Sequence, residues 1–279
     1  MPATQIAQNL AFINWTVLTG LALGSYAAVI LLRRRTGATR GFLAFTTACA
    51  IAFGLLAWLS DGALPSTLGD SPVTLDPVWD DPRRAALIGF VAFATVALVV
   101  GRVRPSWARL IELAAVATGA LTLIFGSFAW GGGSLGTAAL LVELAAVSAA
   151  TGGVFAAMIL GHWYLVTPKL PEAPLILLSR VLVVVVATQV VLFVVWAMTS
   201  AGPAGGAPFS ALTGEWALFV WLRLIVGLIF PLVVSVAAVK TAQTRSMESA
   251  TGLLYINVGT IAAGTILAAG LYFGAGLLV

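Results

Sequence analysis

Two ionisable residues within otherwise apolar segments have the chemistry to handle protons or an anion. Glu143 lies within the apolar run 137–166, and Arg223 lies within the apolar run 216–239. At about 1.5 Å per residue along a helix, both lie roughly 10 Å below the same membrane surface. A charge at that depth is costly unless it is paired or hydrated. We therefore expect either a buried ion pair that fixes helix register or a site for a proton or an anionic substrate.

A second candidate group lies at the other end of the segment that contains Glu143. His162 is the only histidine of the chain and stands beside Trp163 and Tyr164. Imidazole titrates near neutral pH and both donates and accepts hydrogen bonds, so it can exchange a proton with a quinone or another carbonyl. The residues expected at this depth are His162, Trp163, Tyr164, Arg109, Glu112, Arg180, Tyr255 and Asn257. They also fit an ordinary belt of aromatic and basic side chains at a membrane surface.

The same residue counts exclude several kinds of cofactor chemistry. One histidine is too few for a haem held by two histidines, and Cys49, the only cysteine, permits neither an internal disulfide nor a cysteine-ligated cluster. The chain has no HExxH motif and no Walker lysine loop. We expect no haem, no metal and no covalently bound cofactor.

The elements that must position these residues are membrane-spanning helices. Hydrophobic residues make up 61% of the 279 residues and charged residues only 9%, far from soluble domains. Crossing a bilayer takes about 20 apolar residues in a helix. Eight such runs are expected, at 13–32, 42–60, 85–101, 110–130, 137–166, 175–199, 216–239 and 251–278. The predicted fold class is an all-α integral membrane bundle.

The distribution of basic residues predicts an orientation. If the helices alternate, one side of the membrane receives most of the arginines and lysines, including Arg33, Arg34, Arg35 and Arg40. The positive-inside rule then places both termini outside, in a prokaryotic inner membrane. This bias also explains the net charge of +4 without any binding of nucleic acid.

The longest predicted loop, Asp61–Arg84, is acidic and rich in proline. Its carboxylates are Asp61, Asp70, Asp76, Asp80 and Asp81. Such a loop is either a solvated connection or a docking face for an extrinsic partner.

An internal repeat divides the chain into two four-helix halves, 1–133 and 134–279. The stretch GSYAAVIL at 24–31 aligns without gaps with GVFAAMIL at 153–160. Both stretches run in the same direction across the membrane, which predicts a parallel repeat. Small residues such as those at Thr151–Gly153 are expected where two helices approach closely.

The topology and the first helix, NWTVLTGLALGSYAAVILL, resemble the membrane-anchor subunits of the polysulfide reductase and dimethyl sulfoxide reductase group. That resemblance implies a quinone-binding platform that passes electrons to an extrinsic iron–sulfur subunit and carries no metal of its own. It implies a quinone head group near Asn14 and Trp15, with Glu143 and Arg223 handling protons. In this sequence, His162 lies at the other end of the bundle.

Three functions stay open from the sequence. The first is a haem-free, quinone-interacting subunit of a respiratory or photosynthetic electron-transfer complex, which is favoured because few polar residues are expected in mid-membrane. The second is a secondary transporter or permease, favoured by the repeat, by Pro231 and by Glu143 with Arg223. The third is a purely structural subunit of a larger assembly.

Overall fold

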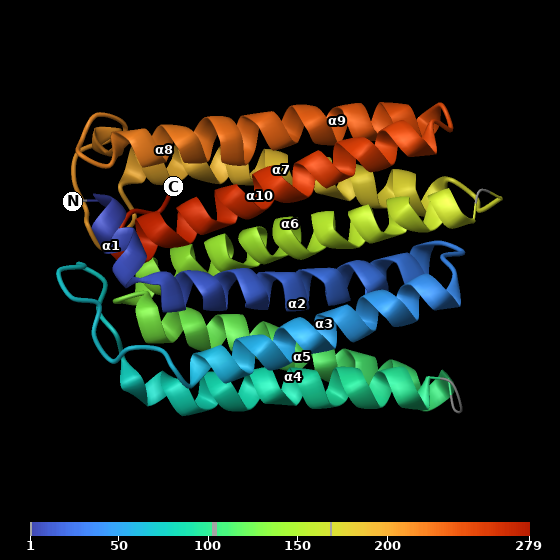
Figure 1. Cartoon of the computed structure of the whole chain (residues 1–279). Helices are drawn as coiled ribbons and strands as arrows, with labels where there is room; N and C mark the ends of the chain where they lie inside the picture. Colours follow the sequence, from blue (N-terminus) through green and yellow to red (C-terminus); the bar gives the residue numbers. More distant parts are fainter. Residues whose placement is uncertain (1, 102–104, 168) are drawn as a thin grey trace.

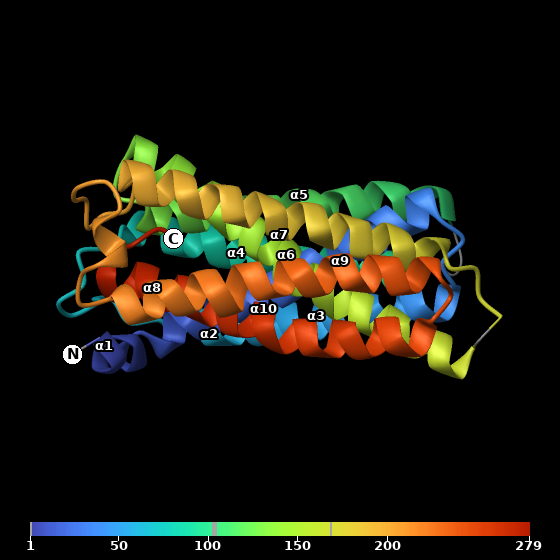
Figure 2. The ribbon, with the colours of Figure 1, turned by 90° about the horizontal axis from the view of Figure 1, so that it is seen from above.

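Eight membrane-length helices lie side by side in one elongated bundle (Figures 1 and 2). The computed structural model describes residues 2–101, 105–167 and 169–279. Over these residues no strand is formed, and eight helical stretches are long and apolar enough to cross a membrane. The predicted all-α, multi-pass membrane class is confirmed.

The helices follow the predicted spans, with one addition at the start of the chain. The short helix α1 (Pro2–Gln8), which the sequence analysis did not predict, packs against the end of α10. The first half contains α2 (Leu10–Arg35), α3 (Arg40–Asp61), the turn η1 (Pro77–Trp79), α4 (Asp80–Val100) and α5 (Pro105–Trp130). The second half contains α6 (Ser134–Val166), α7 (Ala173–Thr199), η2 (Ser210–Leu212), α8 (Ala217–Leu224), η3 (Ile225–Ile229), α9 (Phe230–Gln243) and α10 (Met247–Ala275).

The two ends of the bundle differ in what they carry. Both termini and the loops 62–79, 131–133 and 200–216 lie at one end, here called the termini end (Figures 1 and 2). The other end, here called the basic end, carries the last residues of α2, α4, α6 and α9. Arg33, Arg34, Arg40 and Arg245 lie there. The helices therefore alternate as expected, while the assignment of the termini end to the outer face of a membrane stays a prediction.

Helices α2 and α6 form the centre of the bundle. Over their apolar windows 67% and 72% of the residues are buried, against at most 39% in the other spans. They cross at Gly24 and Gly152, where an added Cβ would overlap the backbone of Ser148 or Ser25 on the opposite helix. Small residues at a crossing let two backbones approach closely. Gly152 from the predicted small-residue face thus lies at the α2–α6 contact.

The contacts between the two halves are paired around this crossing. Helix α2 packs against α10 of the second half, and α6 packs against α5 of the first half. If α2 corresponds to α6 and α5 to α10, these two contacts are equivalent. A parallel repeat with its axis at the α2–α6 crossing requires this packing.

The seventh span is interrupted in mid-membrane by the π-helical turn η3. Pro231 follows at the start of α9 and has no backbone N–H to donate to the carbonyl one turn back. At this break an added Cβ on Gly227 would approach Gly264 Cα of α10 to 2.6 Å. Proline and the close backbone contact together explain the local change of helix type. The π-helical turn contains Gly227 and ends shortly before Pro231.

Candidate functional site

The two ionisable residues predicted within the membrane meet at the termini end. An Nη2 nitrogen of Arg223, on α8, lies 3.4 Å from Oε1 of Glu143, on α6. Both residues are buried, with 2% and 7% of their surface exposed. The Nε1–H of Trp196, on α7, donates to Oε2 of Glu143 at 3.2 Å, and Nε–H of Arg223 donates to the Val279 carbonyl at 3.3 Å. The expected contact between Glu143 and Arg223 is therefore present, in a site that three helices build.

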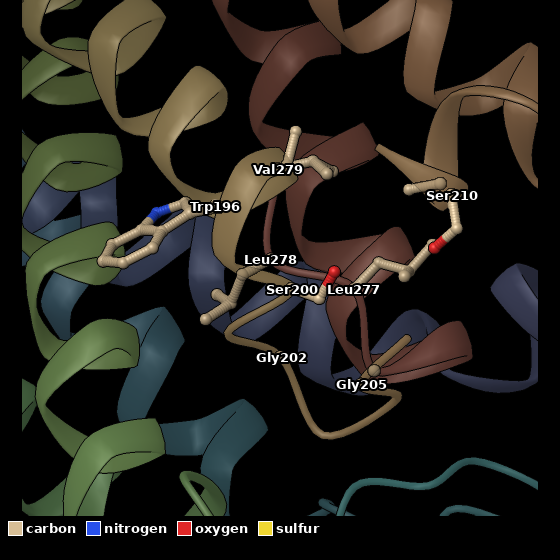
Figure 3. A pocket seen from close by; sticks show the side chains of 11 residues that line it. Trp196, Ser200, Gly202, Gly205, Ser210, Leu277, Leu278 and Val279 are labelled. Carbon is tan, nitrogen blue, oxygen red and sulfur yellow. The ribbon is translucent and has the colours of Figure 1, made fainter. Parts of the chain in front are cut away.

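Two small cavities lie near this ion pair, one beside its partners Trp196 and Val279 and the other beside Glu143 itself. The first, of about 20 Å³, lies between Trp196 at the end of α7, the loop near Ser200 and Gly202, and the last residues up to Val279 (Figure 3). The second, also about 20 Å³, is lined by Glu143, Thr16 on α2 and Tyr272 on α10, among others. A cavity needs only about 10–15 Å³ to hold one water molecule. The cavity beside Glu143 is large enough for about one water molecule and is too small for a quinone ring.

A second buried arginine lies at the same end, in the first half of the chain. Arg83, on α4, donates from Nε and Nη2 to the two carboxylate oxygens of Asp61, at 2.9 and 3.1 Å. Its Nη1 donates to Asp80 at 2.7 Å. Arg83 and Asp61 are 2% and 4% exposed. A forked arginine–carboxylate contact of this kind fixes both partners in one geometry.

Tryptophan rings surround the Arg83 guanidinium. Its central carbon lies 4.7 Å from the ring centre of Trp130, at the end of α5, and 5.9 Å from that of Trp15, on α2. The two indoles meet edge to face at 4.8 Å. The Tyr272 hydroxyl donates to the Trp130 carbonyl at 2.7 Å and so holds the end of α5. The cation is thus stabilised by aromatic faces as well as by carboxylates.

A larger cavity opens beside this arginine. It has a volume of about 300 Å³ and lies between the ends of α2, α3, α4 and α5 and the loop 62–79. Phe12, Leu64 and Leu75 supply apolar walls, and Arg83 and Arg84 supply donors. Ligand sites in proteins have volumes of about 300–1,000 Å³ and combine apolar walls with a few polar groups. We name this space the Arg83 cavity.

The structure separates two residues that the family resemblance places together. Asn14 is exposed on the surface of the bundle, whereas Trp15 is fully buried under Arg83. The Trp15 Nε1–H has no hydrogen-bond partner among the described residues. Trp15 contacts Trp130, and Trp130 lines the Arg83 cavity.

The residues expected together at the basic end have separate partners. His162 is exposed and lies 3.3 Å, from Nδ1, from the Tyr255 hydroxyl. Tyr164 is buried and its hydroxyl donates to the Pro171 carbonyl. Other contacts are Glu112 with Arg33, Asn257 with Ser235, and Trp163 with Phe42 and Phe45. These residues therefore form no single site, and His162 lies far along the bundle from Glu143.

The acidic loop also differs from the expected solvated connection at both of its ends. Asp61 is the last residue of α3 and is buried, and Asp61 and Asp80 both bind Arg83. The Asp76 carboxylate accepts a hydrogen bond from the Val78 N–H and starts η1. The sequence contained a signal for the Arg83 pair, because a loop joining antiparallel helices brings the end of one beside the start of the next.

No group of three or more histidine, cysteine, aspartate or glutamate residues able to hold a metal is found in the described part of the chain. Comparisons with protein-family models, with curated proteins and with solved structures found no match. The resemblance to the polysulfide reductase and dimethyl sulfoxide reductase anchors therefore stays a prediction.

Proposed function

We propose that the chain is a haem-free, multi-pass subunit of a respiratory or photosynthetic electron-transfer complex in a prokaryotic inner membrane, and that it binds a quinone head group. The observation that carries this proposal is the Arg83 cavity, with its volume of about 300 Å³ and its buried cation. An extrinsic redox subunit would dock at the termini end, where the cavity lies under the loop 62–79.

The residues of the cavity fit the head group of a quinone. Arg83 uses three of its N–H groups on Asp61 and Asp80, and a guanidinium has five. Two remain to donate to a carbonyl oxygen. Phe12, Leu64 and Leu75 supply the apolar walls that a flat ring needs. When bound, a quinone would supply the capacity to accept electrons together with protons.

The acidic residues have two tasks at this site. Asp61 is buried and holds the Arg83 guanidinium in one orientation. The Asp80 side chain is 52% exposed and contacts the same guanidinium. Asp80 therefore links the cavity to water at the termini end and can exchange protons with it.

Two tryptophan substitutions in the covering loop test the proposal. Ser66 lines the Arg83 cavity, and Thr67, the next residue of the same exposed loop, does not. We expect Ser66→Trp to fill the opening and to weaken binding of a short-chain ubiquinone or menaquinone analogue by about tenfold or more, as loss of a site's contacts does. Thr67→Trp is the matched control and should bind as the unmodified chain does. Equal binding by the two variants would contradict the proposal.

Native mass spectrometry of the gently solubilised complex tests the partner. A mass that includes a redox subunit or a bound quinone supports the electron-transfer proposal. A bare monomer or homodimer without quinone supports the alternative, a secondary transporter or permease. A constant protein partner that carries no redox group, without quinone, supports a purely structural subunit.

The transporter alternative has a specific observation in its favour. Arg223 is the next-to-last residue of α8, close to the π-helical turn η3, and a water-sized cavity is lined by its partner Glu143. Interrupted helices beside charged residues occur at transport sites. A proton-coupled transporter would show proton movement in liposomes that is lost in Glu143→Gln and kept in Ser66→Trp.

A further inference from the structure

A wide cleft opens at the basic end, between the same helices as the Arg83 cavity but at the opposite end of the bundle. It has a volume of about 950 Å³. The α2–α3 turn lies on one side of it and the ends of α4 and α5 lie on the other (Figure 1). Among the described residues, four arginines line it, Arg33, Arg34, Arg40 and Arg109. The proposed function does not use this cleft.

The charges in the cleft are unbalanced. Glu112 is its only acidic lining residue among those described, and its carboxylate pairs with Arg33. Among the described residues no salt bridge involves Arg34, Arg40 or Arg109. Three arginines that line one cleft are thus left without a carboxylate partner in the described part of the chain. Arginine is the side chain best shaped to bind phosphate oxygens in pairs.

The walls below the arginines are apolar. Leu43 and Ala44 lie about one turn further into α3 than Arg40, and Ala97 and Leu98 lie in the last turn of α4. The cleft therefore changes from cationic at the end of the bundle to apolar toward its middle. A ligand that fills it has an anionic head and a hydrocarbon part.

We propose that this cleft binds an anionic glycerophospholipid of the bilayer. Its phosphate contacts Arg34, Arg40 and Arg109, and the first carbons of its acyl chains lie along Leu43 and Leu98. Basic pockets between membrane helices bind anionic head groups through such contacts. A free phosphate compound shares the head-group chemistry, but it leaves the apolar wall without a partner. The position at the end of the spans also matches the depth of a lipid head group.

Lipid binding to the purified chain tests this proposal. The protein is stripped of lipid in mild detergent, and phosphatidylglycerol is titrated while bound mass and thermal unfolding are followed. In parallel, phosphatidylcholine and water-soluble glycerol 3-phosphate are titrated. We expect phosphatidylglycerol alone to bind and to raise the unfolding temperature.

A pair of double variants locates the site. Arg40→Gln with Arg109→Gln removes two cleft charges, and Arg180→Gln with Lys240→Gln removes two exposed charges of the second half that do not line the cleft. We expect the first double variant to bind phosphatidylglycerol about tenfold or more weakly than the second, because each arginine adds to attraction for anionic lipid. Arg40→Lys with Arg109→Lys keeps the charges and retains most of the binding.

Three results would overturn the proposal. Equal phosphatidylglycerol binding by the two glutamine double variants would show that the cleft is not the site. Equal binding of phosphatidylcholine would show that the arginines do not select the lipid. Equal stabilisation by glycerol 3-phosphate would assign the cleft to a soluble phosphate compound instead. The last two comparisons use the unmodified chain, so they stand even if a variant fails to fold.

Discussion

Each half of the molecule buries one arginine at the termini end, and the two arginines are held differently. Arg83 binds two carboxylates at 2.7–3.1 Å and lies over two tryptophan rings. Arg223 contacts the Glu143 carboxylate at 3.4 Å and the backbone oxygen of Val279, the last residue of the sequence, at 3.3 Å. Both are 2% exposed. The two arginines are therefore equally buried, but they differ in the number and length of their hydrogen bonds.

The space beside each arginine differs as well. A cavity of about 300 Å³ lies against Arg83, whereas the cavity that Glu143 lines has only about 20 Å³. The firmly held arginine thus borders the larger cavity, as expected of a fixed binding group. Of the two small cavities, one is lined by Glu143, and the other by Trp196 and Val279, which contact the pair. Pairing and adjacent volume therefore distinguish the two sites.

The largest expected effect comes from removing the firmly held cation. Arg83→Met leaves the buried Asp61 carboxylate without its forked partner, and breaking a buried pair in this way costs about 3–5 kcal/mol. Thermal unfolding in detergent, followed by tryptophan fluorescence, should show a large drop in unfolding temperature. The control is Arg84→Met, because Arg84 lies over the ring of Trp58 and forms no salt bridge among the described residues. Similar losses in the two variants would contradict the pairing.

A smaller effect is expected at the second arginine. Glu143→Gln and Arg223→Gln should each cost about 1.5–3 kcal/mol, the range for a hydrogen bond to a charged group, because the contact is longer. The charge-swapped double variant, Glu143→Arg with Arg223→Glu, should recover part of that loss. A double-mutant cycle on unfolding free energies measures the coupling. Additive losses would mean that the two residues do not pair, and a loss equal to that of Arg83→Met would remove the distinction between the sites.

The tryptophans sharpen the comparison further. Trp196→Phe removes the Nε1–H that donates to Glu143, and it should couple to Glu143→Gln by about 1 kcal/mol. Trp15 has no partner for its Nε1–H in the described chain, so Trp15→Phe should show no such coupling to Asp61→Asn. The measurement is again a double-mutant cycle, one for each half. Coupling of the same size in both cycles would show that Trp15 stabilises the carboxylate directly.

The smallest effect is expected at His162. It is exposed, and within the described part of the chain its side-chain hydrogen bond is with Tyr255, so His162→Ala should change the unfolding free energy by less than about 0.5 kcal/mol, as surface substitutions do. His162 lies at the basic end, away from the Arg83 cavity. Quinone binding by the His162→Ala variant should therefore match that of the unmodified chain at each pH between 5 and 8. A shifted pH profile would instead support the role first assigned to His162, proton exchange with a quinone.

The sequence by itself determined the class of this protein and one of its two buried arginine sites. Continuous apolar runs must form helices in lipid, because unpaired backbone groups there are too costly. The eight spans therefore follow from the positions of the apolar runs in the sequence. Glu143 and Arg223 could be matched because depth follows from the helical rise and each stands alone in an apolar run.

Only the tertiary structure decided the rest. Whether a side chain faces a neighbour or lipid depends on helix rotation, which apolar residues on all sides do not specify; hence Asn14 is exposed while Trp15 is buried. Asp61 resembled a loop carboxylate until the packing of α3 on α4 brought it to Arg83. Cavities likewise exist only between elements, so the Arg83 cavity and the basic cleft depend on how helix ends diverge. Helix formation is a local property of this chain, and its sites are properties of packing.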